Sequence, residues 1–394
     1  MKELLSSAID ARKKDLTAMA DQIFDWAEIS GKEYQSSALL MDYLRKEGFS
    51  VEQGTGLETA FRATYQNLEG GPTIGILVEY DALEGIGHAC SHHLQGPSGI
   101  GAAIAVKECI RDLPYRLVLY GTPAEETLGG KIVMLDAGYM KELDLVFMSH
   151  GSPTTGVDEK CMALENFVIT FHGVKSHAAI APEKGRSAFD AALLSFHALE
   201  MLREHVPEDT RMHYTIRNAG GPPNVVPDTA VAEYTLRSYN TATLNEIVDR
   251  FLNIIRGASL MTSTTYEVQR DLPFKSKIVS HTVNDLLMKN AAYEHAPCIA
   301  PPRPKTGSSD FGNVLYEIPG SCIRIAFVGK NASAHSEEYL RAGKTKAAHD
   351  AILYAAKIIA DSIADVLMDP DLLKSIKQEF AEAKKALADG GYQA

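Results

Sequence analysis

The strongest constraint on the fold is a series of short, continuously apolar segments in the first half of the chain. They are PTIGILVEYDAL (72–83), YRLVLYGTP (115–123) and LDLVFMSHG (143–151), and a helical pattern rich in small residues separates the first two, at residues 98–113. Strands that are apolar nearly throughout are buried on both faces, which is typical of parallel sheets covered by helices. The sequence therefore predicts an α/β domain with three layers and a mainly parallel sheet.

A different order of elements begins near residue 165. The predicted elements run strand, helix, strand, strand, helix, strand, at residues 165–173, 185–206, 212–220, 229–238, 243–261 and 264–272. This β-α-β-β-α-β order is the ferredoxin-like split motif. Because helices and strands alternate again after about residue 278, we expect a discontinuous domain, residues 1–164 and 278–394, with an inserted ferredoxin-like domain at residues 165–277.

Helical patterns are also present towards both ends of the chain. Residues 3–30 and 33–49 have the spacing of amphipathic helices, and Gly48 closes the second one. The residues from Asp369 onwards predict a charged surface helix with a frayed end, DGGYQA.

Composition argues against several kinds of partner. The 394 residues carry a net charge of -12 without a block of lysine and arginine, which argues against nucleic acid. No apolar run approaches the roughly 20 residues that span a bilayer, and the N-terminus lacks the apolar core of a signal peptide. The five cysteines are odd in number and widely spaced, unlike a disulfide framework. We therefore expect a cytoplasmic protein without a membrane partner.

Side chains that bind metal ions follow four predicted strands, the fourth being PGSCIRIAFVG (319–329). These candidate ligands are Cys90, His92, Glu126, His150 and His335. Because the carboxyl ends of parallel strands meet at one edge of a sheet, we expect the five side chains to converge there. Thiolate, imidazole and carboxylate groups are ligands of zinc and similar divalent ions. Five candidates exceed the four of one tetrahedral ion and would suit two ions that share a ligand.

The adjacent pair Glu125 and Glu126 suggests a division of roles. One carboxylate can bind metal while its neighbour holds a water molecule and acts as general base. Such pairs are also common on solvated surfaces, and isolated histidines are usually structural, so His88 and His93 are expected only as neighbours of the site. No complete dinucleotide fingerprint or phosphate loop is present, so a nucleotide cofactor is not expected.

These residues lie in motifs that resemble a known family. The motifs, in chain order, are EYDALEGIGHACSHH (79–93), GTPAEETLGGKIVMLDAGY (121–139), FHGVKSHAAIAPEKGRSAFDAA (171–192), GGPPNVVPDTAVAEYTLRS (220–238), TGSSDFGNV (306–314) and AHSEEY (334–339). Together they resemble the metal-dependent aminoacylase and carboxypeptidase G superfamily. Within it, the chain looks most similar to the amidohydrolases that include auxin-conjugate hydrolases and aminobenzoyl-glutamate hydrolase.

The resemblance implies roles for individual residues. Two divalent ions, zinc or manganese, would be bound by Cys90, His92, Glu126, His150 and His335. Glu125 matches the general base, and the discontinuous domain matches the catalytic, metal-binding domain. The inserted domain matches a lid that often forms a homodimer interface. In that lid, His177 matches a histidine that stabilises the oxyanion, and Asn224 and Arg237 match positions for a substrate carboxylate.

Two positions depart from the family pattern. Ser91 stands where the family usually has glycine, and His93 stands where asparagine or aspartate is usual. Neither change removes a ligand. The resemblance therefore still implies hydrolysis of an amide bond, in a small N-acyl or N-aroyl amino acid or an unusual dipeptide, through a metal-activated water. Two alternatives remain open, namely hydrolytic deamination of an aromatic or amidine-like amine on the same centre, and a non-catalytic relative that binds a ligand or metal.

Overall fold

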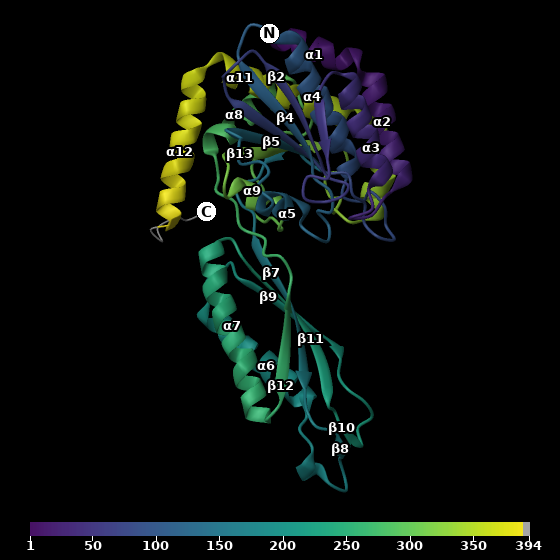
Figure 1. Ribbon diagram of the computed structural model, residues 1–394, viewed down its shortest axis with the longest axis vertical. Coiled ribbons are helices and arrows are strands. Elements are labelled where there is room, and N and C mark those ends of the chain that lie inside the picture. The colour runs from purple at the N-terminus through teal and green to yellow at the C-terminus, as the bar shows by residue number, and fades with distance from the viewer. Residues whose placement is uncertain (389–394) are drawn as a thin grey trace. The chain divides into compact units, whose positions relative to one another are not determined.

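A seven-stranded sheet forms the centre of the unit that carries the candidate ligands. The computed structural model describes residues 1–388, and this unit comprises residues 1–160 together with the described residues from 277 on. Its strands are β1 (Ser50–Gln53), β2 (Phe61–Asn67), β3 (Thr73–Val78), β4 (Tyr115–Gly121), β5 (Leu145–Ser152), β6 (Gly156–Val157) and β13 (Gly320–Ala326). They lie in the order β1-β2-β4-β3-β5-β13-β6, and Figure 1 labels β2, β4, β5 and β13 among them.

The four central strands, β4, β3, β5 and β13, are parallel, and the remaining strands pair antiparallel at the two edges. The central strands are continuously apolar because both of their faces are covered. In β3, Ile74, Ile76 and Val78 belong to one hydrophobic cluster, whereas Leu77 belongs to a second cluster on the opposite face. The prediction of an α/β domain with a mainly parallel sheet is confirmed.

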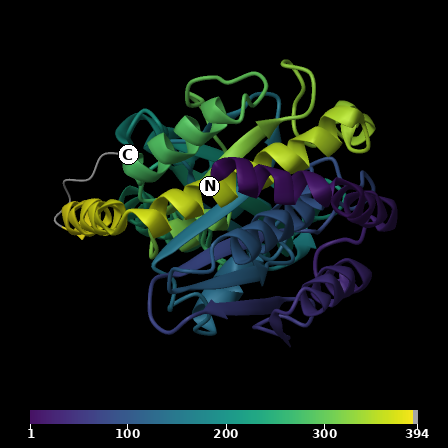
Figure 2. The same ribbon diagram turned by 90° about the horizontal axis from the view of Figure 1, so that it is seen from above.

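Helices cover both faces of this sheet, which gives the three layers. The larger cluster contains side chains from α1 (Lys2–Ala11), α2 (Lys13–Trp26), α3 (Tyr34–Lys46), α4 (Gln95–Cys109), α8 (His281–Tyr293), α10 (Glu337–Ala342), α11 (Lys346–Met368) and α12 (Pro370–Ala388). The smaller cluster contains side chains from α5 (Gly130–Asp136) and α9 (Phe311–Leu315). Figure 2 shows α1 beside α11, against which it packs.

The helices at the two ends of the chain differ in detail from the sequence prediction. The helical spacing predicted at residues 3–30 is divided at Arg12 into α1 and α2, and α2 ends where Ala27 adopts a left-handed φ of 44°. The predicted C-terminal helix is α12, whereas the expected frayed end, residues 389–394, lies outside the described residues.

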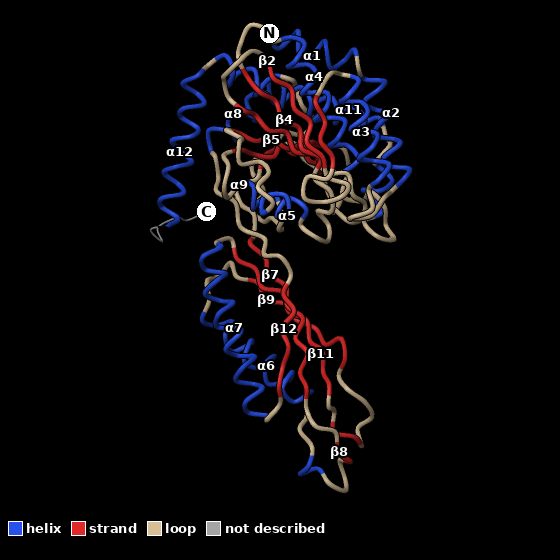
Figure 3. Tube along the Cα trace, in the orientation of Figure 1, coloured by secondary structure: helices blue, strands red, loops and turns tan. Residues whose placement is uncertain are grey.

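The second unit, residues 161–276, contains a four-stranded antiparallel sheet. Its sheet strands are β7 (Ala163–His172), β9 (Arg211–Asn218), β11 (Thr229–Ser238) and β12 (Thr265–Arg270), in the order β12-β7-β11-β9. The helices α6 (Ala188–Leu202) and α7 (Thr241–Thr262) cover one face, as Figure 3 shows. In β7 and β11, buried residues alternate with partly exposed ones, as expected for a sheet covered on one face. The predicted ferredoxin-like order is confirmed.

All five cysteines are free thiols, as their number and spacing predict. Cys298 is exposed, whereas the other four are partly buried. Among the described residues, no helix combines the length and the apolarity that a membrane span requires.

Candidate metal centre

All five predicted metal ligands lie in the first unit, within or after its four central parallel strands. The ligand atoms of Cys90, His92 and His150 lie within 4.8 Å of one another, and so do those of Cys90, Glu126 and His335. The sulfur of Cys90 is therefore common to two groups of three ligands. Such an arrangement suits two divalent ions that share one thiolate.

His92 and His150 are each oriented by hydrogen bonds on Nδ1. Nδ1 of His150 donates to the carbonyl oxygen of Gly151 at 2.8 Å, and its Nε2 lies 3.6 Å from Cys90 Sγ. Nδ1 of His92 lies 3.1 Å from the carbonyl oxygen of Asp81 and 3.2 Å from its Oδ1. Nδ1 of each ring is thus engaged, which leaves Nε2 as the nitrogen that can bind a metal ion, as is usual for histidine ligands.

Two buried atoms in this cluster have no hydrogen-bond partner among residues 1–388. They are His92 Nε2 and Glu126 Oε1. Buried polar atoms without a partner are rare in folded proteins, because leaving them unpaired costs about 1–3 kcal/mol. Since both are good donors for zinc or manganese, the residues present fit a divalent ion.

The electrostatics of the cluster also favour cations. Burial alone would lower the pKa of His92, but the acidic groups around it, first Cys90 and then Glu79, raise the pKa well above its usual range. Burial lowers the pKa of His150 to about 3, and the charge of Arg324 acts in the same direction. His150 is thus held as the neutral imidazole that binds metal ions.

Asp81 connects the two sides of the centre, although sequence reasoning assigned it no role. Its Oδ1 orients His92, and its Oδ2 accepts hydrogen bonds from the backbone N–H of Glu126 at 3.1 Å and from Ser30 Oγ at 2.7 Å. His335 is fixed mainly through its backbone, with a φ of 64° and an N–H that donates to Ala89 at 2.9 Å. Its side chain is about half exposed, and its Nε2 lies 3.6 Å from Glu126 Oε2.

Glu125 lies beside the centre but in neither group that contains Cys90. A carboxylate oxygen of Glu125 lies within 4.8 Å of ligand atoms of His92 and Glu126. Burial, followed by the negative charges of Glu79 and Asp310, raises the pKa of Glu125 well above its usual range. A carboxylate with a raised pKa, placed next to a metal position, suits proton transfer near neutral pH.

A buried carboxylate holds the loop that carries Glu125, and sequence reasoning missed it. Glu33 is fully buried and accepts hydrogen bonds from the backbone N–H of Ala124 at 3.0 Å, from Gly31 N–H at 2.7 Å and from Thr59 Oγ1 at 2.8 Å. Ala124 has a left-handed φ of 61°, which is unusual for a residue other than glycine. Glu33 therefore helps to hold the strained turn before Glu125.

The side chains at the two departures from the family pattern donate to backbone carbonyl oxygens, Ser91 to that of Cys90 and His93 to that of Gly343. Ser91 adopts a left-handed φ of 66°, and its hydroxyl occupies space that a side chain at Gly151 would need. His93 is fully buried, its Nε2 donates to the carbonyl oxygen of Gly343 at 2.8 Å, and its ring packs edge-on against Phe24. Burial lowers the pKa of His93 well below its usual range.

His88 resembles His93 in its surroundings. Its Nε2 donates to the carbonyl oxygen of Ile23 at 3.0 Å, and its ring stacks on Phe24. Burial lowers the pKa of His88 to about 3. Both histidines therefore serve as neutral packing groups behind the ligand loop.

The three lid candidates occupy two ends of the second unit. His177 in β8 (Ser176–His177) pairs with Val225 in β10 (Val225–Val226), and the carbonyl oxygen of Asn224 accepts a hydrogen bond from Ala178, so His177 and Asn224 are neighbours. Both side chains are exposed. Arg237 lies near the other end of the unit, in β11 opposite Leu164. One chain therefore does not bring all three together.

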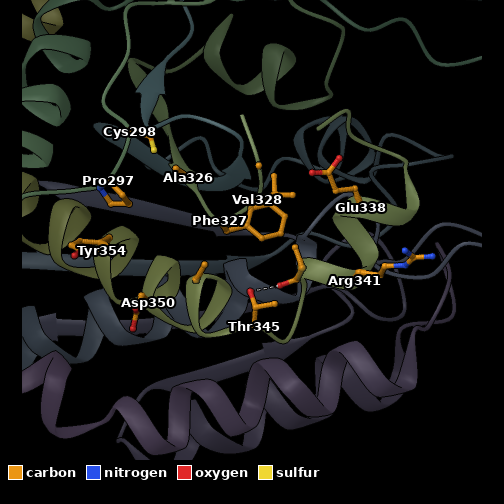
Figure 4. A pocket seen from close by; sticks show the side chains of 13 residues that line it. Pro297, Cys298, Ala326, Phe327, Val328, Glu338, Arg341, Thr345, Asp350 and Tyr354 are labelled. Atoms are coloured by element: carbon orange, nitrogen blue, oxygen red, sulfur yellow. Dashed lines mark hydrogen bonds between the residues drawn. The ribbon is translucent and has the colours of Figure 1, made fainter. Parts of the chain in front are cut away.

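A separate hollow of about 700 Å³ opens beside the carboxyl end of β13. Its floor is mostly apolar, with Pro297, Phe327 and Val328, and charged side chains such as Glu338 and Arg341 lie around it (Figure 4). None of the nine predicted site residues lines this hollow. It is therefore distinct from the cluster around Cys90.

Comparison with known proteins identifies relatives along nearly the whole chain. Residues 164–260 match the model of a peptidase dimerisation domain. The chain is 31% identical to the mouse Xaa-Arg dipeptidase over 96% of its own length and 92% of that protein. It is 28% identical to one of the subunits of the Escherichia coli p-aminobenzoyl-glutamate hydrolase, over 96% and 94% of the two chains.

A solved structure supports the fold. It is a dinuclear metal-binding peptidase of the M20 family from Bacillus subtilis, which aligns with a TM-score of 0.71 over 91% of this chain and 99% of that one. The two sequences are 20% identical, so this likeness concerns the fold alone.

Proposed function

Because the chain belongs to the M20 peptidase family and is a metal-dependent hydrolase of that family, we propose that it cleaves the amide bond of a small N-acyl or N-aroyl amino acid or dipeptide. The observation that carries the proposal is the pair of ligand groups that share Cys90, with Glu125 beside them and in neither group. This combination provides two cation positions and a separate carboxylate, which is what hydrolysis by an activated water requires.

Each residue of the centre has a defined task in this reaction. Cys90, His92, Glu126, His150 and His335 hold two ions, zinc or manganese, and the thiolate favours zinc because it is a soft ligand. When bound, these ions polarise the substrate carbonyl and lower the pKa of a water molecule. Glu125 accepts the proton of that water and later donates it to the leaving amine. Asp81 keeps His92 and the Glu126 loop in position throughout.

The substrate class follows from the relatives. One is an Xaa-Arg dipeptidase and the other a p-aminobenzoyl-glutamate hydrolase, and both names describe release of an amino acid from an amide. We therefore expect a free amino acid as one product. Hydrolytic deamination on the same centre would instead release ammonia, and no observation in the structure favours it.

A product screen tests the proposal. The protein, loaded with zinc or manganese and separately stripped by a chelator, is incubated with dipeptides that end in arginine, lysine or glutamate and with N-acyl and N-aroyl amino acids. Mass spectrometry of the products should show an amino acid only with the metal-loaded protein. Release of ammonia without an amino acid would favour deamination, and no turnover of any compound would favour a non-catalytic relative.

Three features of the lid support the proposal that the chain forms a homodimer. Residues 164–260 match a dimerisation domain, and β9 is an edge strand whose backbone is available for pairing. Large apolar side chains are exposed on α6 and β9, including Met201 at 72% and Leu193 and Tyr214 at 39%. Sedimentation equilibrium should therefore give twice the chain mass of 42.9 kDa. A monomer at micromolar concentration would contradict this part of the proposal.

The lid residues contact the substrate in this proposal, with His177 stabilising the oxyanion and Asn224 and Arg237 holding a carboxylate. The distance between the two ends of the lid means that His177 and Asn224 act together, whereas Arg237 acts separately. Removal of one oxyanion donor typically lowers kcat by about 10²–10³-fold. We expect that loss in His177→Ala with both ions retained, whereas replacement of the partly buried His172 by alanine should keep wild-type kcat. Equal kcat in the two variants would reject the role of His177.

We also propose that the protein is located in the cytoplasm, which is a reducing compartment. Cys90 binds metal only as a thiolate, and oxidation of that sulfur would remove the ligand that both groups share. Fractionation of cells that produce the protein would test this location, and recovery from a secreted or oxidising compartment would contradict it.

A further inference from the structure

A buried lysine side chain lies next to the two proposed metal positions. We propose that the ammonium group of Lys131 occupies a third cation position, enclosed by Glu79, Glu125 and Asp310, and that Lys131 is a positioning residue for the hydrolytic centre. This inference rests on the proposed function, which it deepens by naming what holds Glu125 beside the metal ions.

The burial of Lys131 is exceptional for a lysine. It lies in the first turn of α5, with 0% of its surface exposed, in a protein where most lysines lie at the surface. Its Nζ donates to Asp310 Oδ1 at 2.7 Å and to Glu79 Oε1, and its backbone N–H donates to Asp310 Oδ2 at 2.9 Å. A buried ammonium group is tolerated only when carboxylates surround it in this way.

Three carboxylates surround this position. Oxygen atoms of Glu79, Glu125 and Asp310 lie within 4.8 Å of one another, which is the spacing of a metal-ligand group. Without a cation between them, three buried negative charges at this distance would repel strongly. Burial alone would lower the pKa of Lys131, but the charges of Asp310, Glu79 and Glu125 raise it above its usual range. The group therefore stays charged.

Glu79 connects this third position to the metal ligands. Its Oε1 accepts from Lys131, and its Oε2 accepts from Gln95 Nε2 at 2.6 Å and lies 3.2 Å from His92 Nε2. Lys131 thus neutralises a carboxylate that would otherwise compete with the ion for His92. Because Glu125 completes the same trio, the ammonium also attracts the general base towards one side of the ions.

An ammonium group is better suited to this third position than a divalent metal ion would be. A divalent ion there would bind Glu125 directly and leave no free carboxylate for proton transfer. An ammonium group offers one charge and three hydrogen-bond donors, and its tether to α5 fixes its location. The chain therefore confines divalent ions to the two groups that share Cys90.

The test counts ions and measures turnover in matched variants. Lys131→Met keeps the length of the side chain but removes the charge, and we expect it to bind one more zinc or manganese ion per chain than the wild type. Misplacement of Glu125 should also lower kcat by about 10²-fold, with KM nearly unchanged. Inductively coupled plasma mass spectrometry of gel-filtered protein gives the ion count independently of activity. Lys357→Met, which removes the ion pair between Lys357 in α11 and Asp10 in α1, is the control and should bind as many ions as the wild type.

A second variant separates a specific effect from misfolding. Lys131→Met combined with Asp310→Asn removes one carboxylate together with the ammonium group, so the extra ion should be lost while kcat stays low. If Lys131→Met alone does not fold, the double variant is measured in its place. A wild-type ion count together with wild-type kcat, in either folded variant, would overturn the inference. If the wild type itself hydrolyses nothing, the proposed function fails, whereas the ion counts still decide the role of Lys131.

Discussion

Replacement of Glu125 by glutamine is expected to lower kcat by about 10⁴-fold while both metal ions remain bound. In the proposed mechanism Glu125 is first the base that accepts the proton of water and then the acid that donates it to the leaving amine, so the loss should lie at the upper end of the range for general acid–base catalysis. Ion binding should survive because Glu125 belongs to neither ligand group that contains Cys90. Glutamine has nearly the same shape, so the loop should keep its conformation.

The measurement is kcat per chain of known ion content, with the substrate that the product screen identifies. Glu84→Gln is a matched control, because Glu84 is an exposed glutamate in the loop that leads to Cys90. It should retain wild-type kcat and the wild-type ion count. If Glu125→Gln kept kcat within tenfold of the wild type, another group would have to be the base.

Much of the fold was predictable because burial imposes a local pattern on the sequence. The central strands β3, β4, β5 and β13 are continuously apolar, because each is covered on both faces. The segments predicted from this pattern include these strands completely or to within one residue. The strand predicted at residues 229–238 coincides with β11, because one face of the sheet in the second unit is buried and buried side chains alternate with partly exposed ones. The antiparallel edge strands β1 and β2 were missed, since most of β1 is exposed and its pattern resembles a loop.

The candidate site was predictable only in part, for a different physical reason. A cysteine, histidine or glutamate after a buried strand can be read from the local sequence, because parallel strands end at the same edge of a sheet. A pair such as Lys131 and Asp310, 179 positions apart, leaves no local signal in a single chain. The one available hint was a lysine among the apolar residues of KIVML. The direction of His93, towards Gly343 and away from the ligands, likewise depends on distant packing.

Cys90→Ala should have the largest effect on metal binding, because one sulfur serves both ligand groups. Its loss leaves His92 with His150 for one ion and Glu126 with His335 for the other, and two ligands hold a divalent ion far more weakly than three. We expect neither ion to remain after gel filtration and hydrolysis to fall below detection. Isothermal titration with zinc gives the number of sites and their affinities directly.

His335→Ala provides the contrast that makes the Cys90 experiment specific. His335 belongs to only one of the two groups and is about half exposed, so its removal should weaken one ion and leave the other bound by Cys90, His92 and His150. The two variants should therefore differ in the number of ions lost, two against one, although each removes a single ligand. If Cys90→Ala retained one tightly bound ion, the sulfur would belong to a single metal position, and the two-ion centre would need a different bridging group.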